Sequence, residues 1–162
     1  LFLITGSGGG RWYFNALALQ PGRTRNPGYR ILSVEGTRQP LAFYGFNPEH
    51  AQVSPSVEFR DARNVRVYAV KVENRRHEVL RVVECRNVAV FGHGGHSIIA
   101  DGEAVYRVRN STGVLLAVMG SSAYNPAGYA VYEETPGAPG AGVAQERVLG
   151  VFKRGELDDA AM

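Results

Sequence analysis

The sequence predicts an all-β protein, a right-handed parallel β-helix with about 23 residues per coil, and three observations favour this fold. A frame of residues recurs along the chain at a constant interval of 23. Each copy is a short apolar run with valines at alternate positions, which is typical of a strand. Glycine and proline together make 28 of the 162 residues, which favours a turn-rich fold over a helix bundle.

The repeat is clearest in the middle of the chain. Residues 61–70 (DARNVRVYAV) and 84–93 (ECRNVAVFGH) share the frame Arg-Asn-Val-x-Val-aromatic. Residues 107–120 (RVRNSTGVLLAVMG) carry the same Arg-Asn pair before an insertion, and residues 37–45 (TRQPLAFYG) form a weaker, earlier copy. One coil is too thin to bury its own apolar side, so we expect successive coils to stack.

Three asparagines mark the same point of the frame at intervals of 23, and they are Asn64, Asn87 and Asn110. We expect them to stack in register on consecutive coils, with each side-chain amide bonding to its neighbour. An alternative interpretation makes them turn-forming residues before each strand, with no further role. The valines that follow should point into the core at alternate positions: Val65, Val67, Val88 and Val90.

The single cysteine, Cys85, excludes an internal disulfide framework. It is in phase with Ala62 and Val108 at the interval of 23. We therefore predict a small buried residue within the stack, with a reactive thiol as the less favoured alternative.

The frame divides the chain into two parts. Residues 1–120 should form about five β-helix coils, and residues 121–162 should form a C-terminal strand, a loop cap and a polar tail. A bare β-helix end exposes a sheet edge, and we expect the tail to cap the C-terminal end. The first residues, LFLITG, have the pattern of a strand that lacks a cap. This pattern predicts a further N-terminal β-helix portion or a partner chain at that end.

Composition excludes several function classes. The net charge is only +3, and the 16 arginines and two lysines are spread along the chain without a basic run interleaved with aromatics, so nucleic-acid binding is not expected. No apolar run has the length of a membrane span, so no membrane partner is predicted. The run GSGGG lacks the strand–helix context of a phosphate loop, and no cofactor is predicted.

The same interval relates three side chains that can carry chemistry. Glu49 and Glu73 are 24 residues apart, and His96 follows Glu73 after 23. Equal phase places them on one face of successive coils, about 4.8 Å apart along the axis. Two carboxylates this close favour one protonated and one charged form, and Lys71 or His50 could tune the pair. The alternative is that they are ordinary solvated charges at loop starts.

His93 and His96 have the spacing of an H-x-x-H zinc motif in GHGGHS. The sequence offers no evident third ligand. We therefore predict no metal site.

The order GGGRWYFNALAL, ILSVEGTRQPLAFYGFNPEH and NVRVYAVKVE resembles glycoside hydrolase family 55, the β-1,3-glucanases of the pectate-lyase-like superfamily. The resemblance covers roughly residues 3–73 and includes Gly8–Gly10 with Asn15, Tyr44–Gly45, Glu49–His50 and Lys71–Glu73. The chain departs from the family where Lys71-Val72 replaces Gln-Thr and where NRRHE follows Glu73 in place of an aromatic-rich stretch. These departures reduce the sugar-stacking surface and open the alternative of an anionic glycan.

The resemblance implies a secreted or extracellular enzyme that hydrolyses a polysaccharide such as a β-glucan with inversion. It makes Glu73 the general acid, and Glu49 the residue that holds the attacking water. The candidate substrate-binding residues are His50, Lys71, Tyr44, Asn15 and His96.

Two further functions remain open at this stage. A polysaccharide lyase would use Arg75, Arg76 or Lys71 to neutralise a uronate and His96 or Tyr44 as the base. A non-catalytic β-helix would bind a glycan or only support another domain.

Overall fold

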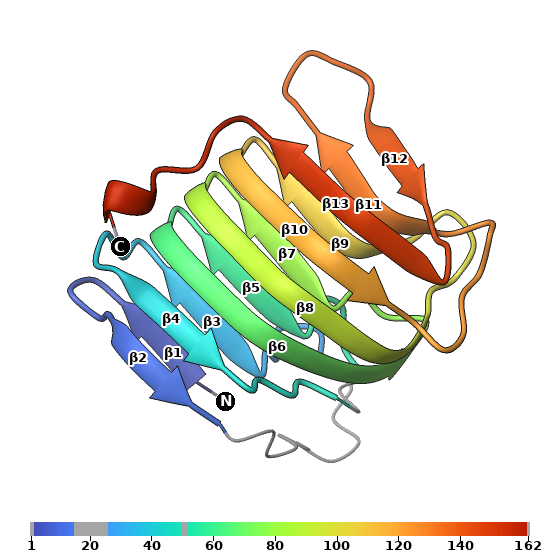
Figure 1. Ribbon diagram of the computed structural model, residues 1–162, viewed down its shortest axis with the longest axis horizontal. Helices are drawn as coiled ribbons and strands as arrows, with labels where there is room; N and C mark the ends of the chain where they lie inside the picture. Colours follow the sequence, from blue (N-terminus) through green and yellow to red (C-terminus); the bar gives the residue numbers. More distant parts are fainter. Residues whose placement is uncertain (1, 15–25, 50–51, 162) are drawn as a thin grey trace.

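The computed structural model describes residues 2–14, 26–49 and 52–161, and it is an all-β parallel β-helix of about four turns (Figure 1). Two sheets face each other along the stack. The first sheet contains β1 (Phe2–Thr5), β3 (Leu32–Glu35), β5 (Val57–Arg60), β7 (Leu80–Val83), β9 (Ala104–Arg109), β11 (Tyr129–Glu134) and β12 (Ala141–Ala144). The second contains β2 (Gly10–Tyr13), β4 (Leu41–Tyr44), β6 (Arg63–Arg75), β8 (Arg86–Ile98), β10 (Thr112–Gly120) and β13 (Val148–Arg154).

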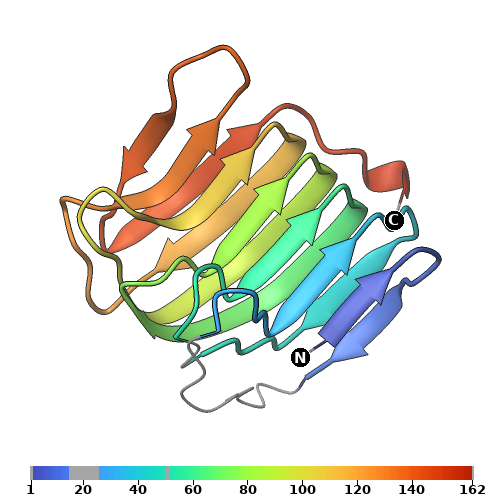
Figure 2. The ribbon, with the colours of Figure 1, turned by 180° about the vertical axis from the view of Figure 1, so that it is seen from behind.

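The coil is right-handed, as the sequence predicts. In Figure 1 the near strands β4, β6, β8 and β10 run towards the lower right while the chain advances from lower left to upper right. Seen from behind in Figure 2, the strands of the other sheet run in the opposite direction. Every neighbouring pair from β1 to β11 within a sheet is parallel.

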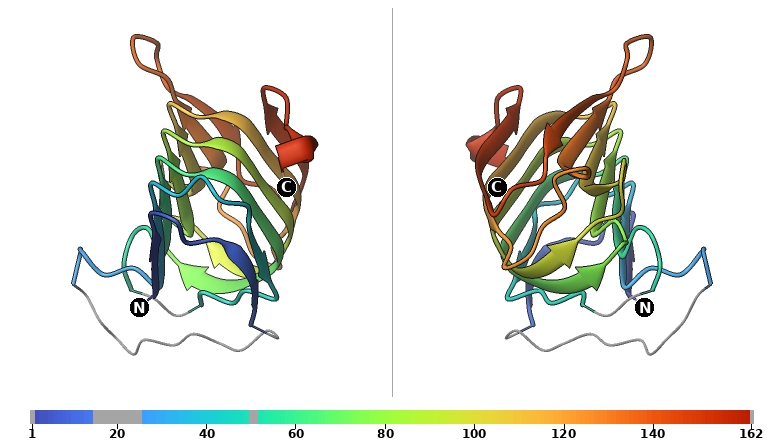
Figure 3. Two further views of the ribbon diagram at one scale, coloured as in Figure 1. Left: turned by 90° about the vertical axis from the view of Figure 1, so that its left-hand side faces the viewer. Right: turned by 90° about the vertical axis from the view of Figure 1, so that its right-hand side faces the viewer.

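The core is a stack of apolar side chains between the sheets. The end-on views of Figure 3 show the two sheets facing each other, and the inward residues are aligned from coil to coil. The four valines predicted to point inward are at most 3% exposed. Because each coil covers the apolar side of the next, the repeat buries a continuous core that no single coil could form.

The corners of the coil are made by residues with left-handed backbone. Asn64 and Asn87 have φ values of 60° and 58° and lie in register at the start of β6 and β8. Asparagine tolerates this conformation better than most residues, because its short polar side chain bonds locally. Here the Asn87 Nδ2 donates to Asn64 Oδ1 at 2.8 Å, so the predicted stack is confirmed for this pair.

The prediction for Asn110 is wrong. Gly113 (φ 62°), and not Asn110, lies level with Asn87, because Thr112 pairs with Arg86. Asn110 instead occupies the preceding corner, level with Glu84, and both have positive φ.

Three extra residues explain the shift. Arg75 and Leu80 are five residues apart, but their partners Ile98 and Tyr106 are eight apart. The added length lies around the turn at Asp101–Gly102, and it moves β9 and β10 by three residues relative to the frame.

Cys85 is 1% exposed, which confirms the prediction of a small buried residue. It is level with Ala62, whose backbone nitrogen lies 3.5 Å from Cys85 Sγ. The expected match to Val108 is wrong, because Val108 pairs with Val82 and the Ser111 hydroxyl contacts the Cys85 nitrogen instead. Burial raises the pKa of the Cys85 thiol to about 11, so the thiolate needed for reactivity is disfavoured.

The C-terminal residues cover one edge of the stack and one corner. β13 pairs antiparallel with β10, while β12 pairs with β11 in a hairpin that projects beyond the coils (Figure 1). Residues 155–159, named the C-terminal strap, then run back along the corner formed by Asn64 and Asn87, named the asparagine corner. The strap backbone at Asp158 exchanges two hydrogen bonds with the Asn87 amide, at 2.6 and 3.0 Å. Asp159 pairs with the buried Arg66 at 3.1 Å.

Candidate functional site

The candidate site lies on the outer side of the second halves of β6 and β8. Each strand contains a left-handed residue in its middle, Ala69 (φ 59°) or Gly92 (φ 77°), which starts a further side of the coil. Beyond it the strands alternate again, so Val70 and Val72 point into the core. Lys71 and Glu73 therefore lie on the outer side.

Lys71 joins the two candidate carboxylates. Its Nζ donates to Glu73 Oε1 at 2.6 Å and also to Glu49 Oε2, which comes from the adjacent coil. The Glu49 side chain is only 7% exposed, whereas that of Glu73 is 46% exposed. The fold thus brings Glu49 and Glu73 together around one ammonium group, although their chemical roles stay predictions.

The side chains of this cluster form two ion pairs, Lys71 with Glu49 and Lys71 with Glu73. Hydrogen bonds from Lys71 to Glu49 and then to Glu73 raise the pKa of the Lys71 ammonium above its ordinary value. In turn, a cation at hydrogen-bond distance favours the charged form of a carboxylate. The three side chains together carry a net charge of about −1 when all are ionised.

Asn47 supports the buried carboxylate from the same loop. In the orientation that satisfies its neighbours, its amide nitrogen donates to the Lys71 carbonyl at 2.8 Å and to Glu49 Oε2 at 3.2 Å. Glu49 therefore accepts bonds from two sides, which holds a buried charge that would otherwise be costly. Asn47 was not predicted from the sequence. The signal that could have identified it is its spacing of 24 residues from Lys71.

His96 lies level with Glu73 on the next coil, as the spacing predicts. Its Nδ1 is 3.3 Å from the Ser122 hydroxyl, which itself donates to the Gly95 carbonyl at 3.0 Å. Because that hydroxyl proton is already used, we infer that His96 Nδ1 carries the proton. His96 Nε2 is then an acceptor, and it is buried without a hydrogen-bond partner among the described residues.

Tyr44 belongs to a different feature, an aromatic ladder on the outer side of β2, β4, β6 and β8. The rings of Tyr13, Tyr44, Tyr68 and Phe91 stack with centroids 4.7, 4.9 and 5.2 Å apart and planes within 12°. Both faces of Tyr44 are therefore covered by neighbouring rings. Sugar stacking needs a free ring face, which in this ladder remains at Tyr13, 63% exposed.

Some of the predicted residues cannot be placed. Asn15 and His50 lie outside the described residues, and so does the side chain of Arg75. Arg76, the other arginine of the lyase alternative, is exposed.

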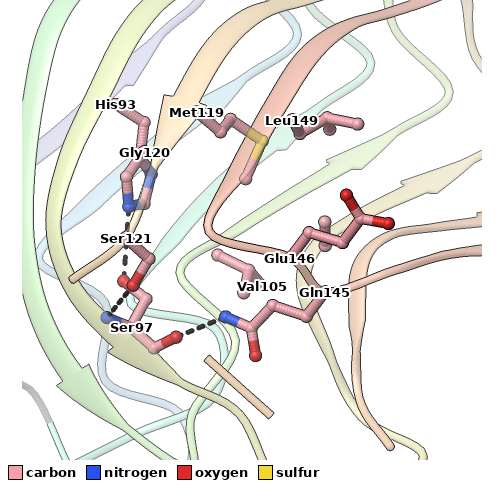
Figure 4. A pocket seen from close by; sticks show the side chains of 10 residues that line it. His93, Ser97, Val105, Met119, Gly120, Ser121, Gln145, Glu146 and Leu149 are labelled. Atoms are coloured by element: carbon pink, nitrogen blue, oxygen red, sulfur yellow. Dashed lines mark hydrogen bonds between the residues drawn. The ribbon is translucent and has the colours of Figure 1, made fainter. Parts of the chain in front are cut away.

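A second polar cluster lies inside the coil, beneath the C-terminal residues (Figure 4). His93 is 5% exposed, and its Nδ1 lies 2.7 Å from the Tyr106 hydroxyl and its Nε2 3.3 Å from the Ser97 hydroxyl. The Gln145 amide bonds to the Ser97 carbonyl and accepts from the Asn125 nitrogen at 2.9 Å. Burial lowers the pKa of His93 to about 4 and raises that of Tyr106, so both are neutral near pH 7.

The cavity beside this buried cluster is too small for a sugar. Its volume is about 10 Å³, close to that of one water molecule. His93 and His96 have different partners, and no group of three His, Cys, Asp or Glu side chains converges within the part of the chain that is described.

Comparisons of the chain with protein-family models, with curated proteins and with solved structures find no match. The parallel β-helix is established by its strand pairing, while the resemblance to one hydrolase family stays a prediction. In residues 2–14, 26–49 and 52–161, no helix has the length and apolar character needed to cross a membrane.

Proposed function

We propose that this protein is a carbohydrate-active β-helix that hydrolyses a polysaccharide at the cluster of Glu49, Lys71 and Glu73. The observation that supports the proposal is that two carboxylates from adjacent coils meet at one lysine ammonium, on an outer side of the coil. Most glycoside hydrolases use a pair of carboxylates as their catalytic residues. The resemblance to glycoside hydrolase family 55 points to the same two residues.

The two glutamates take different roles because their exposure differs. Glu73 is half exposed and can reach the glycosidic oxygen, so it acts as the general acid and gives its proton to the leaving sugar. Glu49 lies deeper, holds the water whose oxygen attacks the anomeric carbon, and accepts a proton from that water as the new bond forms. Water adds to one side of that carbon while the protonated sugar leaves from the other, which inverts the configuration.

The charge of the cluster favours a neutral glycan. With one cation between two carboxylates, a uronate would meet a site of net charge about −1 when all three groups are ionised, and of about 0 when Glu73 carries its catalytic proton. Neither state attracts an anion. This argues for a β-glucan-like substrate over the anionic substrate of a lyase. The proposal includes the partners and location expected from the sequence, which are a polysaccharide, a further β-helical portion or partner chain, and a secreted or extracellular protein.

A second candidate function is glycan binding without catalysis, and Lys71 favours it. An acid must carry a proton before it can give one, and a cation at 2.6 Å favours the charged form of Glu73. If that form persists when the glycan is bound, the cluster orients the sugar and cleaves nothing.

The test is an activity panel of β-glucans and uronate-containing glycans. The wild type should release new reducing ends from a β-glucan without an ultraviolet-absorbing product, since only a lyase leaves a double bond. Glu73→Gln should lower the rate by about 10²–10⁴-fold, because an amide cannot donate an acidic proton. Glu49→Gln should also be strongly impaired, and Glu35→Gln, an exposed glutamate on the other sheet, is the matched control.

The outcomes separate the candidates. Full activity in Glu73→Gln contradicts the assignment of the acid. Binding of a glucan by wild-type protein with no cleavage of any glycan supports the non-catalytic function. An ultraviolet-absorbing product from a uronate-containing glycan would favour the lyase.

Lys71→Met tests the same cluster through its pH dependence. Without the ammonium, the charged form of the acid loses its stabilising neighbour, and protonation persists to higher pH. The alkaline limb of the rate–pH profile should therefore move to higher pH, even if the maximal rate falls. An unmoved alkaline limb would show that the acid of the reaction does not contact Lys71.

A further inference from the structure

Two arginines occupy the same level on adjacent coils at the asparagine corner. Arg63 begins β6 and Arg86 begins β8, and they are register partners. Both side chains are exposed. Partners on neighbouring strands are separated by about 4.8 Å at the backbone, so the two guanidinium groups emerge side by side.

These arginines differ from their neighbours, because neither has a counter-ion among the described residues. Arg38, one coil earlier, binds both carboxylate oxygens of Asp61 at 2.8 and 2.9 Å, and Arg154 pairs with Glu133 at 2.6 Å. Neither Arg63 nor Arg86 makes a side-chain hydrogen bond or ion pair within the described ranges of the chain. Like charges directly opposite each other on adjacent strands destabilise a sheet.

A groove of about 370 Å³ lies against the pair. Asn110 and Thr112 line it from the next coil and add an amide and a hydroxyl to the two guanidinium groups. Of its two lining carboxylates, Asp61 is neutralised by Arg38, which leaves Glu84. Two uncompensated arginines therefore face one carboxylate, and the groove has an excess of positive charge.

We propose that this corner is a second binding site, which takes the carboxylate or sulfate groups of an acidic polysaccharide. Guanidinium groups bind such oxyanions through two parallel hydrogen bonds, and a bound anion removes the repulsion between Arg63 and Arg86. The regular spacing of the coils suits a linear polymer whose charges also repeat. The site goes beyond the proposed hydrolysis, and only the choice of a polysaccharide over another polyanion rests on that proposal.

The corner and the hydrolytic cluster lie at opposite ends of β6. Arg63 is the first residue of that strand, and Glu73 is the eleventh of its 13 residues, which places them about 30 Å apart along the chain. An anionic chain held at the corner would fix the protein to an acidic matrix while a neutral glycan enters the cluster.

Binding measurements on the intact protein test the proposal. The probes are a uronate oligosaccharide, a sulfated oligosaccharide, a neutral β-glucan oligosaccharide, a single-stranded oligonucleotide and inorganic sulfate, titrated by calorimetry at low and high salt. One or both acidic oligosaccharides should bind the wild type, and binding should weaken as salt screens the charges. The double variant Arg63→Gln/Arg86→Gln should weaken this binding by about tenfold or more. Arg11→Gln, another exposed arginine, should bind as the wild type does.

Thermal unfolding gives a second readout that does not depend on measured affinity. Arg86→Gln alone should melt at the same or a slightly higher temperature than wild type, because it removes a repulsive pair. An acidic oligosaccharide should raise the melting temperature of wild type and not that of the double variant.

Three outcomes would overturn the proposal. They are equal binding by wild type and the double variant, an inorganic sulfate affinity equal to that of the oligosaccharides, and equal binding of a single-stranded oligonucleotide. Failure of the hydrolysis proposal shows separately, as absent cleavage of every glycan by a protein that still binds at the corner.

Discussion

Two residues of β8, Gly94 and Gly95, separate His93 from His96, yet the two histidines belong to opposite kinds of polar cluster. His93 points into the coil and bonds to the neutral hydroxyls of Tyr106 and Ser97. His96 lies level with Glu73 on the outer side, beside the ion pairs of Lys71. Inside, burial keeps His93 and Tyr106 neutral, and each is hydrogen-bonded. Outside, two carboxylates meet around one ammonium.

The difference teaches that in this coil the side of the strand decides the chemistry of a residue. A buried ionisable group is cheapest when neutral and hydrogen-bonded, whereas an exposed one can stay charged. The interior cluster therefore contributes to stability and should respond to pH through folding. The outer cluster is available to a ligand and should respond through activity.

Gly95 separates the two clusters, and its substitution should have the largest effect. A Cβ added there would lie 2.1 Å from the Val72 carbonyl oxygen, and its φ of 133° is strained for any other residue. Gly95→Ala should lower the free energy of unfolding by about 3 kcal/mol or more, measured by chemical denaturation.

Gly94→Ala is the matched control one residue away. No atom lies within 4 Å of its added Cβ, and it points outward beside Lys71. Its stability should stay within about 0.5 kcal/mol of wild type. Equal losses in the two variants would mean that the inner and outer sides are not distinguished as described.

The interior cluster should make stability depend on pH. Because the pKa of His93 falls from 6.5 to about 4 in the folded state, the unfolded chain binds more protons between these values. Stability is then complete above pH 6.5 and declines as the pH falls towards 4, by roughly 3 kcal/mol in all. Denaturation curves of wild type between pH 4 and 7 measure the decline.

His93→Gln isolates this contribution. Burial also lowers the pKa of His77, so that residue adds a slope of the same sign to both proteins. The variant should be less stable at pH 7 but lose less on acidification than wild type does. Parallel stability–pH curves would contradict the interior assignment of His93.

The outer cluster should give the smallest change in stability. Lys71 and Glu73 are 42% and 46% exposed, and ion pairs at such positions contribute about 0–1 kcal/mol. Glu73→Gln should therefore unfold within about 1 kcal/mol of wild type, so that any loss of its activity is chemical. A much larger loss would give Glu73 a structural role.

The interval of 23 residues was enough to predict the coil, the inward valines and the Asn64–Asn87 pair, because identical frames on equal coils must align. It also brought Glu49, Glu73 and His96 to one side of the stack. The same interval failed at Asn110, because three residues inserted near Gly102 change the length of one coil. A repeated dipeptide does not reveal which residues of a loop are added.

The interior cluster could not be predicted from the sequence for a different reason. His93, Tyr106 and Gln145 come from separate elements, and Gln145 comes from a region without the repeat. The sequence GHGGHS does not show which histidine points inward and which points outward, because that depends on the strand register. The aromatic ladder would have been easier to predict from the sequence, because Tyr44, Tyr68 and Phe91 follow the repeated frame.

The C-terminal strap changes how the stack should come apart. In a linear array each coil touches only its neighbours, and such arrays fray one unit at a time from an end. The strap bonds to Asn87 on one coil and to Arg66 on the coil before it, while following β13 on a later one. Peeling away the last coil therefore also breaks contacts two coils deeper. The C-terminal half should therefore open as a single cooperative unit and not one coil at a time.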